Sequence, residues 1–184
     1  AFLVISLAMF GLTAGAVWVY LKGERFTEKT FSYDLSYFCG LFAFATAICL
    51  AVQMTLTPII TRFFTTLWIW TELALCLSAP FFFAGVVISL ALTRGPFPVA
   101  RVYGVDLVGA AGGAVGALVL LNITDGPSAV LWIAVIAAIG AISLSVSGIG
   151  GLPEKRPQFH VWLWNRQWIF LLLLLVASIN PFLE

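Results

Sequence analysis

Two carboxylates, Asp106 and Glu72, lie inside long apolar stretches, where an acid could hold a proton, a cation or an ion-pair partner. An ionised side chain at the centre of a membrane helix costs ~3 kcal/mol, so each acid should have a partner. For Asp106 the candidates are Arg101 on the same helix, Arg94 across a short loop, and the positive end of the helix dipole. Tyr103 shares the broad face of Asp106 and is expected to donate a hydrogen bond to it through a neighbour. Asp106 therefore indicates an ion pair that fixes helix packing, a carboxylate linked to proton or substrate movement, or an exposed acid at the membrane interface.

Glu72 and Gln53 lie at similar depths in two neighbouring apolar stretches. An interhelical hydrogen bond between them is the structural interpretation, and a cation or proton site is the alternative. Glu72 is expected nearer the outer side of the membrane and Asp106 nearer the cytoplasmic side, so the two acids do not form one cluster. Because the sequence supplies no polar relay between them, the pattern argues against a pump.

The remaining residue types with reactive side chains do not form a catalytic or metal-binding pattern. The single histidine, His160, has no cysteine or acid at metal-ligand spacing. Cys39, Cys49 and Cys76 lie in apolar stretches without paired spacing, which is typical of small buried hydrophobic residues. No serine occupies a nucleophile elbow. We therefore predict no catalytic residue, no metal site and no cofactor within these residues.

The composition places these groups in a membrane. Of the 184 residues, 62% are hydrophobic and 9% are charged, whereas soluble domains carry about 45–50% apolar and about 25% charged residues. A hydrophobic stretch of about 20 residues crosses the ~30 Å hydrocarbon core as a helix. The formal net charge of +1 gives no basic surface for nucleic acid. We predict a single all-α transmembrane domain of six helices in a lipid bilayer, at residues 1–21, 36–60, 63–93, 98–122, 128–147 and 168–182.

The fourth of these stretches, residues 98–122, is expected to be the centre of the bundle. Asp106, Gly109 and Gly113 fall within a narrow arc of its helix, with Gly116 at the edge. Small residues allow close helix approach in lipid, where the hydrophobic effect does not drive helices together. We therefore expect this face, with its acid, to be covered by neighbouring spans.

Two other stretches carry packing signals. Gly11 and Gly15 give the first span a GxxxG face. The third span, 63–93, is longer than the bilayer core requires and contains Pro80, which removes a backbone hydrogen bond. We expect it to be tilted and kinked at that proline.

Basic residues are divided unequally between the expected loops. With six spans, one side carries eight of the nine basic residues and the other carries only Arg62. The positive-inside rule then places the loops after spans one, three and five in the cytoplasm and both ends on the outer side. The eight are Lys22, Arg25, Lys29, Arg94, Arg101, Lys155, Arg156 and Arg166.

Four segments resemble the membrane region of bacterial spermidine-synthase-like integral membrane proteins: AFLVISLAMFGLTAG (1–15), APFFFAGVVISLALTR (79–94), VARVYGVDLVGAAGGAVGA (99–117) and DGPSAVLW (125–132). The resemblance implies a bacterial inner membrane, one further span before this segment, and an aminopropyltransferase-like domain after it. The catalytic motifs of that domain do not occur in these residues. Arg101, Tyr103 and Asp106 match the family's motif in the membrane region.

These observations favour a non-catalytic membrane anchor or scaffold of a spermidine-synthase-like protein, or an accessory subunit that packs against partner subunits of a larger membrane complex. The alternative is a carrier of polyamines or other small molecules that uses Glu72 and Asp106. Any enzymatic activity would belong to the downstream domain that the resemblance implies.

Overall fold

The computed structural model describes residues 2–26, 30–55 and 63–146, and within these ranges the chain is helical, without strands. All five α-helices are long and apolar enough to cross a membrane. The chain is therefore an all-α membrane protein, and the sixth expected span, 168–182, lies outside the described residues. The elements are α1 (Phe2–Leu21), the short 3-10 helix η1 (Gly23–Arg25), α2 (Phe31–Thr55), α3 (Phe63–Arg94), α4 (Val99–Ile123) and α5 (Gly126–Val146).

The beginning of α2 differs from the sequence prediction, which placed the second span at residues 36–60 and so left Asp34 outside it. The helix starts at Phe31, five residues before the predicted start, and residues 31–38 are all buried. Thr30 donates a hydrogen bond from Oγ1 to Oδ2 of Asp34, at 2.8 Å. An acid in the first turn also interacts favourably with the positive end of the helix dipole. Asp34 therefore lies in the buried first turn of the helix and not in the preceding loop.

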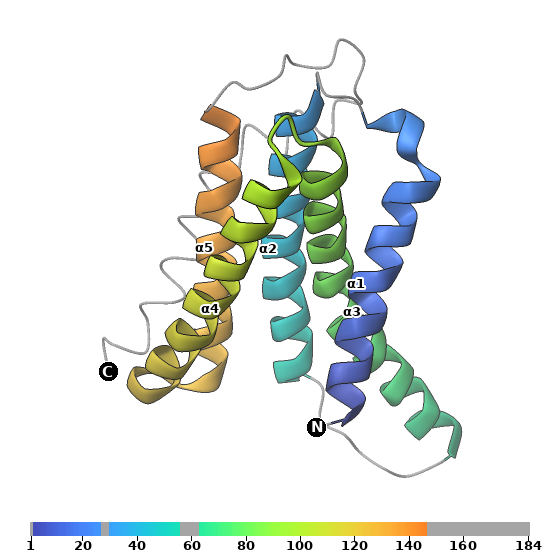
Figure 1. The fold of residues 1–184 in the computed structure, drawn as a ribbon. Helices are drawn as coiled ribbons and strands as arrows, with labels where there is room; N and C mark the ends of the chain where they lie inside the picture. Colours follow the sequence, from blue (N-terminus) through green and yellow to red (C-terminus); the bar gives the residue numbers. More distant parts are fainter. Residues whose placement is uncertain (1, 27–29, 56–62, 147–184) are drawn as a thin grey trace.

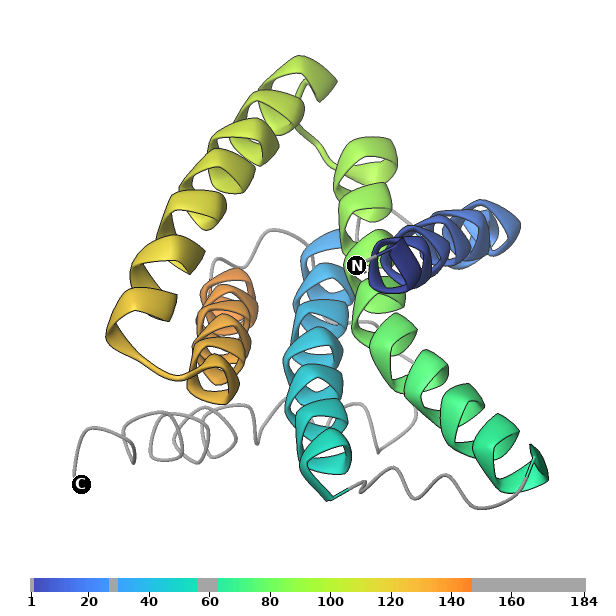
Figure 2. The ribbon, with the colours of Figure 1, turned by 90° about the horizontal axis from the view of Figure 1, so that it is seen from below.

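The helices alternate in direction, and each packs mainly against one or two others. In Figure 1, α1, α3 and α5 run upward, whereas α2 and α4 run downward. The main contacts join α1 to α3, α3 to α2, and α2 to α5. Seen from below in Figure 2, α4 stands to one side and comes close to α5 near the turn that joins them. The centre of the described bundle is therefore formed by α2 and α3.

Glycines bring the backbones of α1 and α3 into direct contact. A Cβ at Gly11 would lie 2.5 Å from the carbonyl oxygen of Ser78. A Cβ at Gly15 would collide with the carbonyl oxygen of Phe82, and one at Gly85 would collide with that of Leu12. The GxxxG face predicted for the first span is thus confirmed as a packing surface, with Gly85 as its complement on α3.

Aromatic side chains fill the space next to this contact. Trp18 of α1 packs edge-on against Phe26 and Phe38, with ring centroids 5.6 Å apart in both pairs. Val86 and Leu90 of α3 are almost completely buried in the same cluster. This cluster joins α1, α2 and α3 at the end of the bundle where α2 begins.

A second contact, between α2 and α5, uses small side chains. Ala43 of α2 and Ala134 and Ala138 of α5 are buried against one another. Ser36 donates a hydrogen bond from Oγ to the carbonyl oxygen of Ala141 at 2.6 Å. Interhelical hydrogen bonds of this kind stabilise membrane bundles by about 0.6 kcal/mol on average. Close packing therefore carries most of the α2–α5 contact.

The expectation that residues 98–122 form the centre of the bundle is wrong for the described part of the chain. No residue of α4 is buried. A Cβ added at Gly109, Gly113 or Gly116 would have no atom within 4 Å. Small residues allow a helix to approach a neighbour closely, but the pattern does not specify which neighbour. Here the small residues of α1 and α3 pack against each other within the chain, whereas the glycines of α4 have no described neighbour.

The remaining predicted fold feature, the kink at Pro80, concerns the long third span. Pro80 lies inside α3, and the helix is continuous from Phe63 to Arg94. Proline removes the hydrogen bond that would reach the carbonyl of residue 76. The bend at this position stays a prediction.

The turn between α4 and α5 is fixed by a helix cap. The carbonyl of Asp125 accepts a hydrogen bond from the backbone N–H of Ala129 at 3.0 Å. Ser128 donates from its side chain to the Asp125 carboxylate, and this hydrogen bond holds the pKa of that carboxyl below its ordinary value. Asp125 therefore caps α5 as an ionised residue at neutral pH.

Substitution of Gly15 tests the glycine contact. Gly15→Ala should lower the free energy of unfolding by about 1–3 kcal/mol, because the new methyl group meets backbone atoms that cannot rotate away. Unfolding in mixed micelles titrated with a denaturing detergent measures this change. Gly104→Ala on α4 is the matched control, since it has the same gain in helix propensity and open space around it. Equal stability of the two variants would contradict the packing described here.

Candidate functional site

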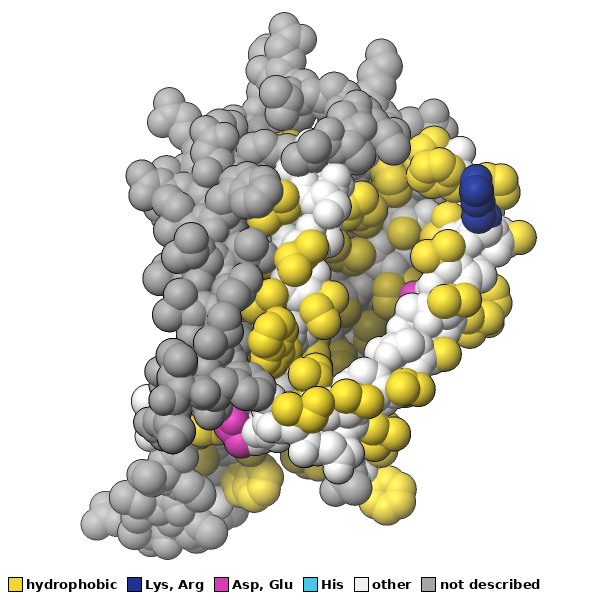
Figure 3. Space-filling model, turned by 90° about the vertical axis from the view of Figure 1, so that its left-hand side faces the viewer, with side chains coloured by type: hydrophobic (Ala, Val, Ile, Leu, Met, Phe, Trp, Pro, Cys, Tyr) yellow, Lys and Arg dark blue, Asp and Glu magenta, His cyan; other side chains and the backbone are white. Residues whose placement is uncertain are grey.

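A cleft between α4 and the rest of the bundle is the most distinctive cavity of the described residues. Its volume is about 450 Å³, within the ~300–1,000 Å³ range of small-molecule sites. Figure 3 shows the corresponding hollow, lined mainly by hydrophobic side chains. The walls come from α2, α3, α4, α5 and the loop before α4, and consist of Phe31, Leu35, Ala91, Phe97, Arg101, Val102, Val105 and Leu144.

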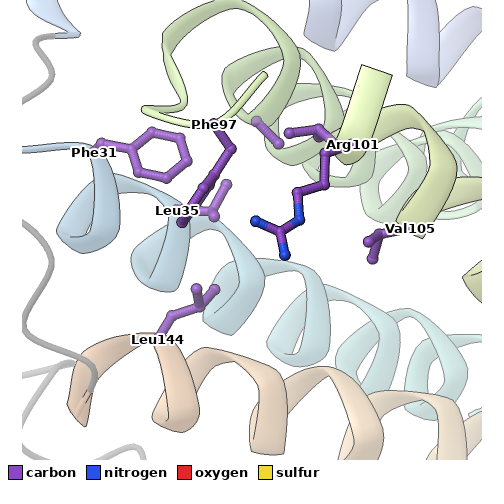
Figure 4. A pocket seen from close by; sticks show the side chains of 8 residues that line it. Phe31, Leu35, Phe97, Arg101, Val105 and Leu144 are labelled. Carbon is purple, nitrogen blue, oxygen red and sulfur yellow. The ribbon is translucent and has the colours of Figure 1, made fainter. Parts of the chain in front are cut away.

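Arg101 is the one charged side chain among these lining residues. Figure 4 shows its guanidinium extending from α4 across the cleft toward α2, with Leu35 and Val105 on either side. The side chain is exposed. The lining contains no carboxylate that could neutralise it. The site therefore combines an apolar groove with one unneutralised cation.

Asp106 and Tyr103 do not join Arg101 in this cleft. Both are exposed on α4, and neither lines the cavity. Among the described residues, no ion pair joins Asp106 to Arg101 or to Arg94. The ion pair considered for Asp106 is thus absent from this part of the chain.

Arg94 belongs to a separate polar site at the end of α1 and α3. Its side chain lies against Gly23, where a Cβ would be 2.8 Å from Nη2. Lys22, Glu24 and Arg25 line the same shallow depression. The guanidinium of Arg25 lies 5.8 Å from the ring centroid of Trp18, a cation–π distance. This end of the bundle is a mixed-charge surface with basic residues in excess.

Glu72 and Gln53 lie on α3 and α2, and both are half-buried. No hydrogen bond joins their side chains in the described part of the chain. Glu72 does not line the cleft below α4. The described residues therefore do not bring Glu72, Gln53 and Asp106 together, and the carrier mechanism built on them stays a prediction.

Sequence reasoning missed a buried polar group at the start of α2. Asp34 is 1% exposed, and Ser32 and Ser36 beside it are also buried. The neighbouring aromatic residues Phe31 and Tyr33 are the signal that could have moved this acid from the loop into the helix, because they indicate an apolar environment. Asp34 serves here to begin α2 with its hydrogen bond from Thr30.

Two cysteines from different helices also come together. The thiols of Cys49 on α2 and Cys76 on α3 lie close enough to interact directly. All three cysteines are free, and Cys39 lies elsewhere on α2. Their spacing in the sequence gives no indication of this pair, because the contact depends on how α2 and α3 are aligned.

Neither metal-ligand geometry in the described residues nor similarity to known proteins indicates a function for this chain. Within the described ranges, no three metal-ligating side chains come together. No family model, curated protein or solved structure matches the chain. The resemblance to spermidine-synthase-like membrane proteins therefore stays an expectation from the sequence.

Oxidation of the cysteines tests the alignment of α2 and α3. Copper-phenanthroline should convert Cys49 and Cys76 to a disulfide, with two protons and two electrons lost to the oxidant, because the thiols are neighbours. Maleimide labelling after denaturation should then count one thiol instead of three. Cys39→Ser should leave the cross-link intact, whereas Cys76→Ser should abolish it. Three reactive thiols after oxidation of the wild type would contradict the alignment.

Proposed function

We propose that this chain is a non-catalytic membrane scaffold or accessory subunit that docks a transmembrane helix of a partner protein on α4. The observation that carries the proposal is that α4, a membrane-length helix with a stripe of small residues, has no buried residue. The lipid bilayer surrounds the rest of the apolar surface.

The chemistry of the exposed face supports a protein partner. Ala110 and Gly113 have small side chains, on which another backbone can approach closely, whereas flexible lipid chains gain little from such a surface. Asp106 lies on the same arc, about 10 Å along the helix from Val99. An ionised acid facing lipid at this depth is costly, and a polar or basic residue on a partner helix would remove much of that cost.

The sequence resemblance suggests the nature of the assembly. We propose that this chain is the membrane domain of a spermidine-synthase-like protein in a bacterial inner membrane, where it acts as an anchor, a scaffold or an accessory subunit of a larger complex. The quoted motifs, including the stretch from Arg101 to Asp106 on α4, support this proposal.

Substitutions on the open face of α4 test the docking proposal. Gly113→Leu or Ala110→Leu should reduce recovery of the partner by at least about tenfold after purification from native membranes in mild detergent, because the side chain blocks close approach. The isolated subunit should keep its stability, since open space surrounds Gly113.

Gly104→Leu is the matched control for that experiment. Gly104 also has open space around it, and it lies about 160° round the helix from Asp106. This variant should recover the partner as the wild type does. The proposal fails if Gly113→Leu retains a full complement of partner, or if no protein accompanies the wild type.

The charge distribution supports a sidedness for the scaffold. Lys22, Arg25, Arg94 and Arg101 lie at the same end of the described bundle, because α1 and α3 end there and α4 begins there. We propose that this end is cytoplasmic.

Cysteine labelling tests this orientation. A membrane-impermeant maleimide should label Lys22→Cys in inverted vesicles but not in intact spheroplasts. Asn122→Cys, at the opposite end of α4, should show the reverse pattern. Labelling of Lys22→Cys in intact spheroplasts would reverse the assigned orientation.

A further inference from the structure

We propose that the cleft beneath α4 binds an anionic phospholipid, with its phosphate on Arg101 and an acyl chain between α4 and the α2–α5 pair. The charge, the depth and the size of the cleft all match such a lipid.

The charge of the cleft selects an anion. Arg101 is the one ionised group in a lining that is otherwise hydrophobic. Its guanidinium extends into the cleft rather than away from it (Figure 4). Arginine offers several N–H donors in a planar arrangement that matches a phosphate. The first turn of α4 adds the positive end of a helix dipole.

The depth of the cleft matches the position of a lipid headgroup. Arg101 lies two residues after the first residue of α4, at the end of the span. Val105, which lines the same cleft, lies about 6 Å further along the helix. The cation is thus at the level of headgroups, and the apolar wall continues from it toward the hydrocarbon. Basic pockets between transmembrane helices bind acidic headgroups in this way.

The size of the cleft suits an acyl chain better than a whole helix. A helix about 10 Å wide that crosses ~30 Å of hydrocarbon occupies roughly 2,400 Å³. The cavity holds about 450 Å³. An acyl chain fits within this volume, whereas a transmembrane helix would extend beyond the cleft. The cleft borders the small-residue face of α4, because Val102, which lines the cleft, lies only about 20° round the helix from Gly109 and Gly113.

Native mass spectrometry of the purified subunit tests the charge requirement. Protein exchanged into equal amounts of phosphatidylglycerol and phosphatidylcholine should retain phosphatidylglycerol with a preference of about tenfold, as expected for a charge-assisted contact. Arg101→Gln should reduce that preference to near unity. Arg94→Gln should keep it, since Arg94 is at the same end of the bundle but lines the other polar site.

A second pair of variants tests the groove without changing the charge. Val105→Trp should fill the cleft and reduce retention of phosphatidylglycerol by about tenfold, because the acyl chain loses its space. Leu107→Trp is the control, since Leu107 is also exposed on α4 and does not line the cavity.

Helix content by circular dichroism and a single elution peak show which variants are folded. Folded Arg101→Gln or Val105→Trp that retains phosphatidylglycerol as the wild type does would overturn the proposal. Equal displacement of the lipid by free oleate would overturn the assignment to a phospholipid.

Discussion

The bundle depends on the contact between the backbones of α1 and α3. Gly11, Gly15 and Gly85 allow backbone atoms of the two helices to meet where any side chain would collide. In lipid, where apolar side chains gain little from leaving the solvent, such close approach supplies the dispersion energy that holds helices together. Trp18 and its aromatic neighbours then extend the contact to α2. Displacing α1 from α3 would therefore open the largest buried cluster as well.

The existence of the five described helices could be predicted from the sequence because membrane spans need length and apolarity, and both are visible in it. The predicted bounds of the described helices agree with the structure to within a few residues, except at the start of α2, where Asp34 looks like a loop residue and is buried. The predicted end of the second span at residue 60 and the sixth span lie outside the described residues. The GxxxG face of α1 was also visible, because it depends on one helix alone. Its complement Gly85 was not, because a single glycine has no periodicity.

Features that depend on pairs of helices could not be predicted in the same way. The meeting of Cys49 and Cys76 depends on the alignment of α2 with α3. The small residues of α4 are a stronger pattern than those of α1, yet they are open in the described bundle. Composition shows that a surface suits close packing, and it does not show whether that surface is used within the chain. The cleft around Arg101 could not be predicted either, because it depends on the distance that separates α4 from α2 and α5.

The order of contacts along the chain has a consequence for biogenesis. Gly15 meets α3 about 70 residues later in the sequence, and Ser36 bonds to Ala141 at a separation of 105 residues. As the ribosome delivers the spans one by one, α1 and α2 must enter the bilayer before the helix that joins them exists. The arrival of α3 closes both contacts at once, and α5 completes the assembly after α4 has already passed into the membrane. The backbone contact that holds α1 in the bundle therefore forms only after the third span has entered the membrane.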